Sequence, residues 1–356
     1  MSLLTTLFPV PSFFALPAVG IDFSDAVMRY VELAPITEGI APKRFGEVPI
    51  PAGCMQGGRV VDEVAFTEFL RTVKREHNLE FVRVAIPESQ VYLFTLSIDA
   101  AAGNDIRAAI ELVIEDNIPI RASETIFDFS ILKTSGTAII VAVVAVSEAT
   151  ATTLHTCFVN AEMKPLSFEL DAQAIARAVL PITARGCRMI VDIGAHRTGI
   201  IITAEGSVVY TATIEFGGDM LTQTLSTKLG IGPAEAEALK KTIGLSHSPE
   251  HASFFEALSS SIVPLKDEIN HRYLYWQEKK EQLGGFPSIE TIYICGGHSN
   301  LSGLNDYLSA ALKLPVMQAN SWVNCFAFEA YVPEMPFETS MSYVTAVGLA
   351  LADHIS

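Results

Sequence analysis

Two segments far apart in the chain share one pattern, and this repetition constrains the fold more than any other feature. Residues 20–24 read GIDFS, and residues 191–198 read VDIGAHRT. In each segment an apolar run ends at an aspartate beside small residues, and a second apolar run follows, at 27–33 or at 199–203. The pattern predicts two β-hairpins, each with an aspartate at the turn.

Hairpins of this kind can bind phosphate, because their backbone N–H groups point at the anion while the aspartate holds a hydrated divalent cation. Two of them facing each other would enclose the phosphate tail of a nucleotide. Taken singly, each is better explained as an ordinary hairpin with an aspartate at its turn. The candidate phosphate-binding residues are Asp22, Phe23, Ser24, Asp25 and Arg29 in the first hairpin, and Asp192, Gly194, Ala195, His196, Arg197 and Thr198 in the second.

A third segment favours the nucleotide interpretation. Residues 289–295 have the pattern of a buried strand, Gly296, Gly297, His298 and Ser299 form a turn, and a helical pattern follows at 301–308. Such a turn lets a flat ring lie against bare backbone at a helix N-terminus. In this order, the three segments resemble the phosphate-1, phosphate-2 and adenosine motifs of the actin and sugar-kinase superfamily.

The resemblance narrows to one family of that superfamily. Residues 111–120, ELVIEDNIPI, are similar to the E-x-x-x-x-x-x-I-P-F stretch of the PilM family of type IV pilus assembly proteins. Residues 216–222 and 263–269 are similar to two further segments of that family. The similarity extends over residues 19–351, and the order and spacing of the motifs carry it rather than any single motif.

The resemblance implies an α/β fold, namely the two-lobed actin-like (RNase H-like) ATPase fold with a small inserted α+β subdomain. An N-terminal tail would comprise residues 1–16. Lobe I (subdomain 1A) would comprise 17–86, 165–187 and 338–356, and lobe II (2A) would comprise 188–337 with a 2B insertion at about 219–286. The inserted, FtsA-like subdomain (1C) would span 87–164, where the chain reads strand, helix, strand, strand and helix.

The resemblance also assigns roles to residues. Asp22 and Asp192 would hold Mg²⁺ through water, and Asp171 would orient an attacking water as the catalytic residue. The turn of Gly217, Gly218 and Asp219 would lie along the ribose. Glu237 and Lys240, three residues apart on a predicted helix, would bracket the ribose hydroxyls and the adenine; the alternative is an exposed helical ion pair of small energetic value.

Three positions depart from the family pattern. Ser24, His196 and His298 stand where relatives usually have glycine or another small residue, so each adds a side chain where backbone would approach a ligand. These replacements predict weak nucleotide binding and slow or absent ATP hydrolysis. A metal site built from the two histidines is a disfavoured alternative.

The implied function is that of an ATP- and Mg²⁺-binding scaffold, cytoplasmic and held at the inner membrane through partners. Its partners would be the N-terminal peptide of a PilN-like single-span membrane protein and components of the pilus motor, with self-association left open. The predicted peptide groove lies beside the inserted subdomain; the alternative is that its acids are only the solvated face of a helix. The groove residues are Glu111, Glu115, Ile118, Pro119 and Ile120.

Two other functions are weaker alternatives. An FtsA-like division protein that forms filaments would be expected to end in an amphipathic membrane helix, whereas this sequence stops directly after an apolar helical pattern at 343–352. A kinase of the same superfamily would need a set of substrate-binding residues, and no such set is evident.

Composition agrees with these expectations. The net charge of -16 argues against nonspecific binding to nucleic acid. The five cysteines show no metal-ligand spacing, which favours reduced core thiols. Residues 3–21 are apolar, but Pro9, Pro11 and Pro17 interrupt them, so the sequence does not predict a continuous membrane-spanning helix there.

Overall fold

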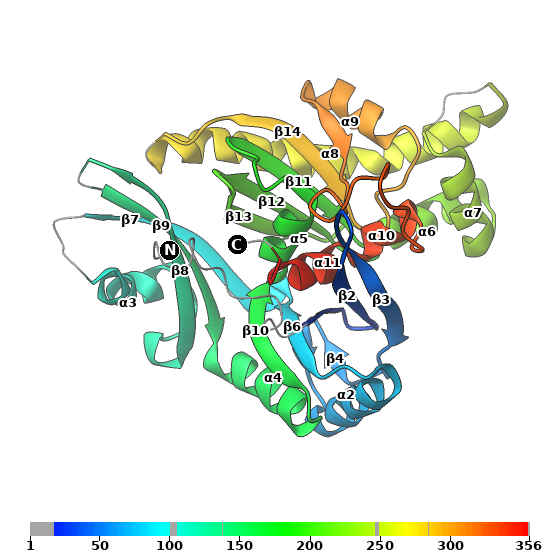
Figure 1. Cartoon of the computed structure of the whole chain (residues 1–356). Coiled ribbons are helices and arrows are strands. Elements are labelled where there is room, and N and C mark those ends of the chain that lie inside the picture. Colours follow the sequence, from blue (N-terminus) through cyan, green and yellow to red (C-terminus); the bar gives the residue numbers. More distant parts are fainter. Residues whose placement is uncertain (1–17, 100–104, 137, 246–248, 284, 355–356) are drawn as a thin grey trace.

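The computed structural model of the protein describes residues 18–99, 105–136, 138–245, 249–283 and 285–354. The expected N-terminal tail, 1–16, lies outside these ranges. Two five-stranded sheets organise the described part of the chain, and a three-stranded sheet stands apart from them (Figure 1). We call the regions around the two larger sheets lobe I and lobe II, and the region of the three-stranded sheet the module.

The two large sheets have the same topology. In each, three antiparallel strands are followed on one side by two parallel strands, in the order β10-β6-β1-β2-β3 for lobe I and β13-β12-β11-β14-β15 for lobe II. The repeated hairpins of the sequence are therefore equivalent elements of two related sheets. The strands of lobe I are β1 (Val19–Phe23), β2 (Val27–Ile36), β3 (Gly39–Pro49), β6 (Phe81–Ile86) and β10 (Lys164–Leu170); those of lobe II are β11 (Cys187–Ile193), β12 (Thr198–Ala204), β13 (Ser207–Ile214), β14 (Ile289–Cys295) and β15 (Val316–Gln318).

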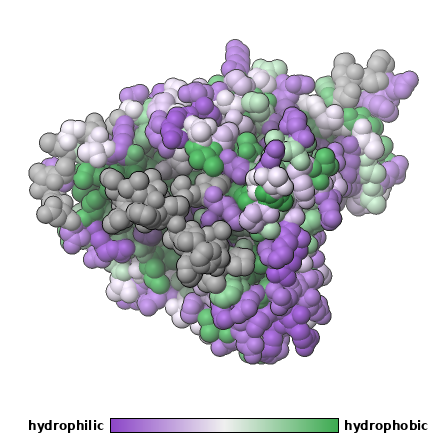
Figure 2. All heavy atoms as spheres, in the orientation of Figure 1, coloured by the Kyte–Doolittle hydropathy of each residue, from purple (hydrophilic) through white to green (hydrophobic). Residues whose placement is uncertain are grey.

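Helices α2 (Glu63–His77) and α4 (Glu148–Asn160) cover the outer face of the lobe I sheet. The side chain of Asp62 caps α2 by accepting a hydrogen bond from the N–H of Ala65, at 2.9 Å. Apolar residues recur on one side of this helix and join Phe158 of α4 in a common core. The opposite side is charged, and Figure 2 shows hydrophilic residues over the end of the lobe that carries α2.

The outer face of the lobe II sheet packs against a group of helices (Figure 1). The sequence of 254–282 fits either one long helix or two consecutive helices with Pro264 at the start of the second; the structure has one continuous helix with Pro264 inside it. The 3-10 turn η5 (Pro249–His251) precedes it. The helices are α6 (Gly218–Leu229), α7 (Pro233–Ile243), α8 (Ala252–Gln282) and α9 (Leu304–Leu312).

Two helices lie between the sheets, α5 (Asp171–Val179) and α11 (Val344–Leu351). Their buried side chains share one core with residues of both lobes, such as Val31 of β2 and Ile201 of β12. Contact between backbones is unusually close here. A Cβ atom on Gly348 of α11 would collide with the carbonyl oxygen of Ala174 in α5, and one on Gly20 of β1 would collide with the carbonyl oxygen of Ala346. The turn before α11 is formed by α10 (Phe337–Ser340) and η6 (Met341–Tyr343).

The module consists of a sheet in the order β7-β9-β8 with α3 on one face. Ile110 and Ile114 of α3 pack on Val141, Val143 and Ala145 of β9. The opposite face of the sheet turns to the lobes, since Ile140 belongs to the lobe II core. The elements are β7 (Val91–Asp99), α3 (Ile106–Asn117), η4 (Ala122–Glu124), β8 (Thr125–Ser135) and β9 (Ala138–Ser147).

The packing of α4 indicates where the inserted subdomain ends. Residues 87–164 include α4, yet Leu154 and Phe158 of that helix are buried in the core of lobe I together with α2. We therefore propose that the subdomain closes after β9, near Ser147, and that α4 is part of lobe I. The connection at its other end is the 3-10 turn η2 (Glu88–Gln90), which joins β6 to β7.

Two further features concern what the fold buries. All five cysteines are buried and unpaired, in agreement with the expectation of core thiols. Within the described ranges, no helix combines the length and apolar character that crossing a membrane requires. A small hairpin, β4 (Met55–Gln56) and β5 (Arg59–Val60), extends from lobe I next to η2.

The close approach of α11 and α5 gives the first prediction. Gly348→Ala forces a methyl group against the backbone of α5, so we expect the free energy of unfolding to fall by on the order of 2–3 kcal/mol. Denaturant titration followed by circular dichroism measures this change. Gly232→Ala is the matched control, because a Cβ there meets nothing within 4 Å. Equal stabilities of the two variants would contradict the packing described here.

Candidate functional site

The two repeated aspartates occupy equivalent places in the two lobes. Asp22 lies near the end of β1 and is paired in register with Arg29 of β2. Asp192 lies near the end of β11, between Gly199 of β12 and Cys295 of β14. Each carboxyl is half-buried, and the two are close enough for the negative charge of Asp22 to raise the pKa of Asp192. The structure therefore brings the two predicted cation-directing residues to one place from opposite lobes.

A third carboxyl joins them. Asp171 is the first residue of α5, directly after β10, and its Oδ2 accepts a hydrogen bond from the backbone N–H of Glu88 at 3.1 Å. Burial, and then the charges of Glu88 and Asp22, raise the pKa of Asp171 well above its usual value. For Asp192, burial and then the charge of Asp22 raise the pKa to about 7. Burial also raises the pKa of Asp22, although Arg29 opposes this.

Glu88 is a member of this group that the sequence analysis missed. Its Oε2 accepts a hydrogen bond from Oγ1 of Thr213 at 2.5 Å. Its place becomes evident only in the folded sheet, because β1, β6 and β10 are neighbouring parallel strands whose carboxyl ends meet at one edge. Asp22, Glu88 and Asp171 stand at or just after those three ends, the edge at which α/β sheets bind ligands.

The other residues of the first hairpin are engaged locally. The hydroxyl of Ser24 accepts from the N–H of Val27 at 3.2 Å, which stabilises its own turn. Phe23 is buried in the lobe I core. The carboxylate of Asp25 accepts from the N–H groups of Gly57 and Gly58 at 2.7 and 2.8 Å, so it fastens the β4–β5 turn. Arg29 is also engaged, since its Nε donates to Oε2 of Glu47 at 2.7 Å, so Asp22 is the member of the first set that remains a candidate for contact with a ligand.

The second hairpin and the Gly-Gly turn form one unit. The N–H of Gly218 donates to the carbonyl of Gly194 at 3.0 Å, and the N–H of Asp219 donates to the carbonyl of Ala195 at 2.9 Å. A Cβ on Gly217 would collide with the same carbonyl of Ala195. The sequence therefore needs glycine here for the turn to lie flat on the hairpin.

Exposed and buried polar groups complete this unit. Nδ1 of His196 lies 3.1 Å from Oδ2 of Asp219, with both side chains largely exposed. Arg197 pairs with Glu215 at 3.1 Å. The hydroxyl of buried Thr198 donates to the carbonyl of Phe216 at 2.7 Å. Thr198 is thus structural, whereas the nitrogen atoms of His196 and Arg197 lie at the exposed edge of the second hairpin.

The adenosine-like turn packs directly behind Asp192. Gly296 has a φ of 93°, and a Cβ there would collide with Oδ1 of Asp192, so glycine is required at this position. Ser299 is buried and donates to the carbonyl of Gly296 at 2.7 Å, which fixes the turn. The imidazole of His298 lies over Gly218, where a Cβ would overlap the ring. Gly297 faces Ser342, and a Cβ on Gly297 would lie only 2.6 Å from the hydroxyl oxygen of Ser342.

Lys240 and Glu237 also belong to this site. Only 5% of Lys240 is exposed, and its Nζ contacts Oε2 of Glu237 at 2.5 Å, Oγ1 of Thr222 at 2.8 Å and the carbonyl of Gly218 at 3.1 Å. The alternative of an exposed ion pair is wrong for Lys240, because the Gly-Gly turn covers it. Although burial opposes it, hydrogen bonding to Lys240 and Thr222 lowers the pKa of Glu237 to about 2.

These groups line a cavity of about 520 Å³ between lobe II and the turn before α11. We call it the His298 cavity. It has the size of a small-molecule pocket and combines a flat ring, a buried ion pair and backbone groups. Its lining includes Glu237, Lys240, Lys241, Gly297, His298 and Ser342. Among the residues that the structure describes, no cluster of three or more His, Cys, Asp or Glu side chains is arranged to hold a metal ion by itself.

The predicted peptide-binding residues lie elsewhere. Glu111 is exposed on α3, Ile118 is buried beneath that helix, and Oε1 of Glu115 accepts from the N–H of Ala122 at 2.7 Å. Pro119 is exposed and Ile120 is half-buried just after the helix. Because α3 covers the face of the module that points away from the lobes, the structure does not bring these five residues to the junction with lobe I.

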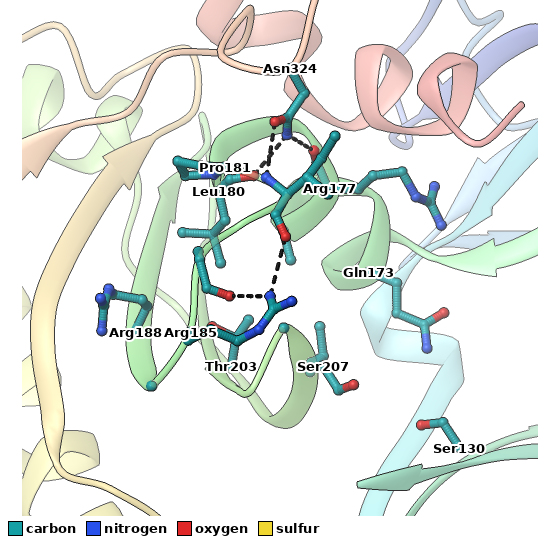
Figure 3. A pocket seen from close by; sticks show the side chains of 16 residues that line it. Ser130, Gln173, Arg177, Leu180, Pro181, Arg185, Arg188, Thr203, Ser207 and Asn324 are labelled. Carbon is teal, nitrogen blue, oxygen red and sulfur yellow. Dashed lines mark hydrogen bonds between the residues drawn. The ribbon is translucent and has the colours of Figure 1, made fainter. Parts of the chain in front are cut away.

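A second cavity, of about 410 Å³, lies where the module meets α5 and lobe II (Figure 3). Ser130 of β8 forms one side, and the other sides are formed by α5, the segment leading to β11 and the turn between β12 and β13 of lobe II. Arg185 reaches into it and donates to the carbonyl oxygens of Ile182 and Ala184, at 3.3 and 2.9 Å. We call it the junction cavity; its polar lining includes Ser130, Gln173, Arg177, Arg185, Arg188 and Asn324.

Comparison with protein families decides the relationship of this chain. The family described as type IV pilus assembly protein PilM matches residues 20–354. The protein belongs to the PilM family of type IV pilus assembly proteins. The resemblance inferred from the sequence motifs is thereby confirmed.

Solved structures confirm the fold of this PilM-family chain. A chain of a PilM–PilN type IV pilus biogenesis complex is similar with a TM-score of 0.74 and 19% identity, covering 95% of this chain and 98% of that one. MreB5 of Spiroplasma citri bound to ADP is similar with a TM-score of 0.54 and 13% identity, covering 92% and 94% of the two chains. The two-lobed actin-like fold expected from the sequence is therefore correct.

The crowded carboxyls give a prediction for stability. Because the folded state raises the pKa of Asp192 to about 7, above the value of an unfolded aspartate, it binds more protons than the unfolded state between about pH 4 and 7. We expect the free energy of unfolding to rise as pH falls from 7.5 to 5.5, with Asp192 contributing on the order of 1–2 kcal/mol.

Denaturant titrations of the protein without nucleotide or divalent cation at several pH values measure this dependence. In Asp192→Asn, stability at pH 7.5 should exceed that of the unsubstituted protein and should change less with pH. The exposed Asp306→Asn on α9 is the control and should keep the original slope. A slope that is the same with and without the Asp192 carboxyl would contradict the desolvation inferred for this residue.

Proposed function

We propose that this PilM-family protein is an actin-like scaffold that binds ATP with Mg²⁺ between its lobes. The observation that carries this proposal is the placement of Asp22 and Asp192 opposite each other, with the His298 cavity next to Asp192. Charge repulsion among the half-buried carboxyls favours a cation, and a hydrated Mg²⁺ held by carboxylates also bridges phosphate oxygens.

A structural relative of known ligand content supports nucleotide binding. MreB5 of Spiroplasma citri has been solved with ADP and with AMPPNP, and the latter structure matches 93% of this chain with a TM-score of 0.54 and 13% identity. In this PilM-family protein, the Lys240–Glu237 pair would meet the ribose, and the imidazole of His298 would stack on a flat ring. We propose slow or absent hydrolysis, because Ser24 and His196 stand where the family resemblance implies glycine or another small residue, and each makes a local contact there.

The nucleotide proposal is tested by calorimetry with Mg-ATP. We expect binding to the unsubstituted protein and at least about tenfold weaker binding to Asp192→Ala, since the variant loses the carboxylate that directs the cation. Asp306→Asn should bind as the unsubstituted protein does. Asp192→Ala removes a half-buried carboxyl whose ionised form is disfavoured in the folded protein, so a folding defect is not expected to obscure the result. Equal affinities for both proteins, or no binding to either, would refute the proposal.

We further propose that the protein holds the N-terminal peptide of a PilN-like single-span membrane protein and is kept at the inner membrane by it. A chain similar over 95% of this sequence occurs in a PilM–PilN complex. The junction cavity suits a short peptide, because it lies between β8 and α5 and is lined by both polar and apolar groups. In the described part of the chain, Arg185 has no carboxylate partner, so the cavity favours a peptide with an acceptor group at this point.

The binding surface is tested by fluorescence titration with the labelled N-terminal peptide of a PilN-like single-span protein from the same organism. Ser130→Trp fills the junction cavity from an exposed strand position and should weaken binding about tenfold or more. Glu111→Lys, on the exposed face of α3, should have little effect. If Glu111→Lys abolishes binding while Ser130→Trp does not, the peptide binds the α3 surface predicted from the sequence and the junction cavity is excluded.

A further inference from the structure

The turn η2 occupies an unusual position in the fold. It is three residues long, Glu88–Gln90, and it joins the last residues of β6 in lobe I to β7, the first strand of the module. The carboxyl end of β6 lies beside that of β1, which carries Asp22. A single turn is therefore both part of the wall of the candidate nucleotide site and the attachment point of the module.

Glu88 stands at the start of the module and contacts both lobes. Its backbone N–H donates to Asp171 of lobe I at 3.1 Å, and its side chain accepts from Thr213 of β13 in lobe II at 2.5 Å. Its Oε2 also lies 3.8 Å from the position that a Cβ of Gly199 would take, and the Cβ of Asp192 lies at the same distance from that point. The carboxylate of Glu88 thus reaches across the cleft to the hairpin that carries Asp192.

The rest of η2 is hydrogen-bonded to the β4–β5 turn, which in turn contacts the first hairpin. Ser89 and Gln90 both donate to the carbonyl of Gly57, at 3.0 and 2.9 Å. The N–H of Gly57 in turn donates to Asp25 of the phosphate-1 turn at 2.7 Å. A continuous set of hydrogen bonds therefore runs from the phosphate-1 turn through the β4–β5 turn to the start of the module.

A nucleotide phosphate would disturb Glu88 more than the other carboxyls. Asp22 and Asp192 are fixed within strands, and Asp171 is fixed at the start of α5, whereas the side chain of Glu88 is held from the other lobe by the hydroxyls of Thr213 and Thr211. Added negative charge in a partly desolvated cleft repels the group that can move. The position of Glu88 on η2 means that its displacement also releases the contact between the lobes next to the module.

We propose that Glu88 and Thr213 form a latch between the lobes that the phosphates of a bound nucleotide open, and that η2 passes this change to the module and its junction cavity. The latch rests on the proposed binding of Mg-ATP and of the partner peptide, and it adds a coupling between the two sites. Because coupling is reciprocal, peptide binding changes the affinity for Mg-ATP by the same factor as Mg-ATP changes the affinity for the peptide.

The coupling is tested by titrating the labelled peptide with and without saturating Mg-ATP. We expect Mg-ATP to change the peptide dissociation constant of the unsubstituted protein about fivefold or more. In Glu88→Gln, which keeps the shape of the side chain and removes its charge, Mg-ATP should bind more tightly and the effect on the peptide should fall below about twofold. Glu215→Gln, an exposed carboxylate paired with Arg197 near the same hairpin, is the control and should preserve the coupling.

A second measurement separates the latch from the proposed binding activities. Hydrogen–deuterium exchange of the protein without ligands should become faster in β13 and β7 in both Glu88→Ala and Thr213→Val, and the double variant should add little to either. Because the measurement uses no ligand, this result is expected even if Mg-ATP or the partner peptide does not bind. Unchanged exchange in both single variants, or coupling in Glu88→Gln equal to that of the unsubstituted protein, would overturn the latch.

Discussion

The close packing of α5 and α11 between the two sheets is the contact on which the rest of the structure depends. Gly348 and Gly20 allow backbone to touch backbone there, so the two sheets share one core rather than forming independent domains. Because β1 and β11 end above this core, their hairpins are placed opposite each other. The geometry of the candidate site is therefore set by the packing of α5 and α11, to which Asp22 and Asp192 do not themselves contribute.

The same arrangement makes the site electrostatically costly. Asp22, Asp171 and Asp192 are partly removed from water, and their pKa values are all raised, with burial as the leading cause. A fold that only needed stability would place such groups at the surface or pair them with cations. Gathering them at the carboxyl ends of neighbouring strands fits a site whose charge is completed by a ligand, and perturbed carboxyls of this kind mark functional sites more often than structural ones.

The sequence was sufficient for those parts of the fold that local patterns determine. The hairpin aspartates, the Gly-Gly turns and helices such as α7 follow from residue type and spacing, and the family resemblance supplied their order. Glu88 was missed because its importance depends on which strands are neighbours, and β6 lies beside β1 only in the folded sheet. The groove assigned to α3 was placed without knowing which face of the module sheet that helix covers, since the apolar residues of β9 serve both faces.

The residues that depart from the family pattern have a physical meaning that only the structure supplies. Ser24 bonds its own turn and His196 pairs with Asp219, so neither side chain fills the space between the lobes. His298 differs from them, because its ring lies on Gly218 and forms part of a cavity wall. A ring that entered this cavity would meet an imidazole instead of bare backbone, and burial together with the nearby charge of Lys240 lowers the pKa of that imidazole. The neutral form favoured by this shift offers a flat aromatic face without a positive charge, which suits stacking more than contact with phosphate.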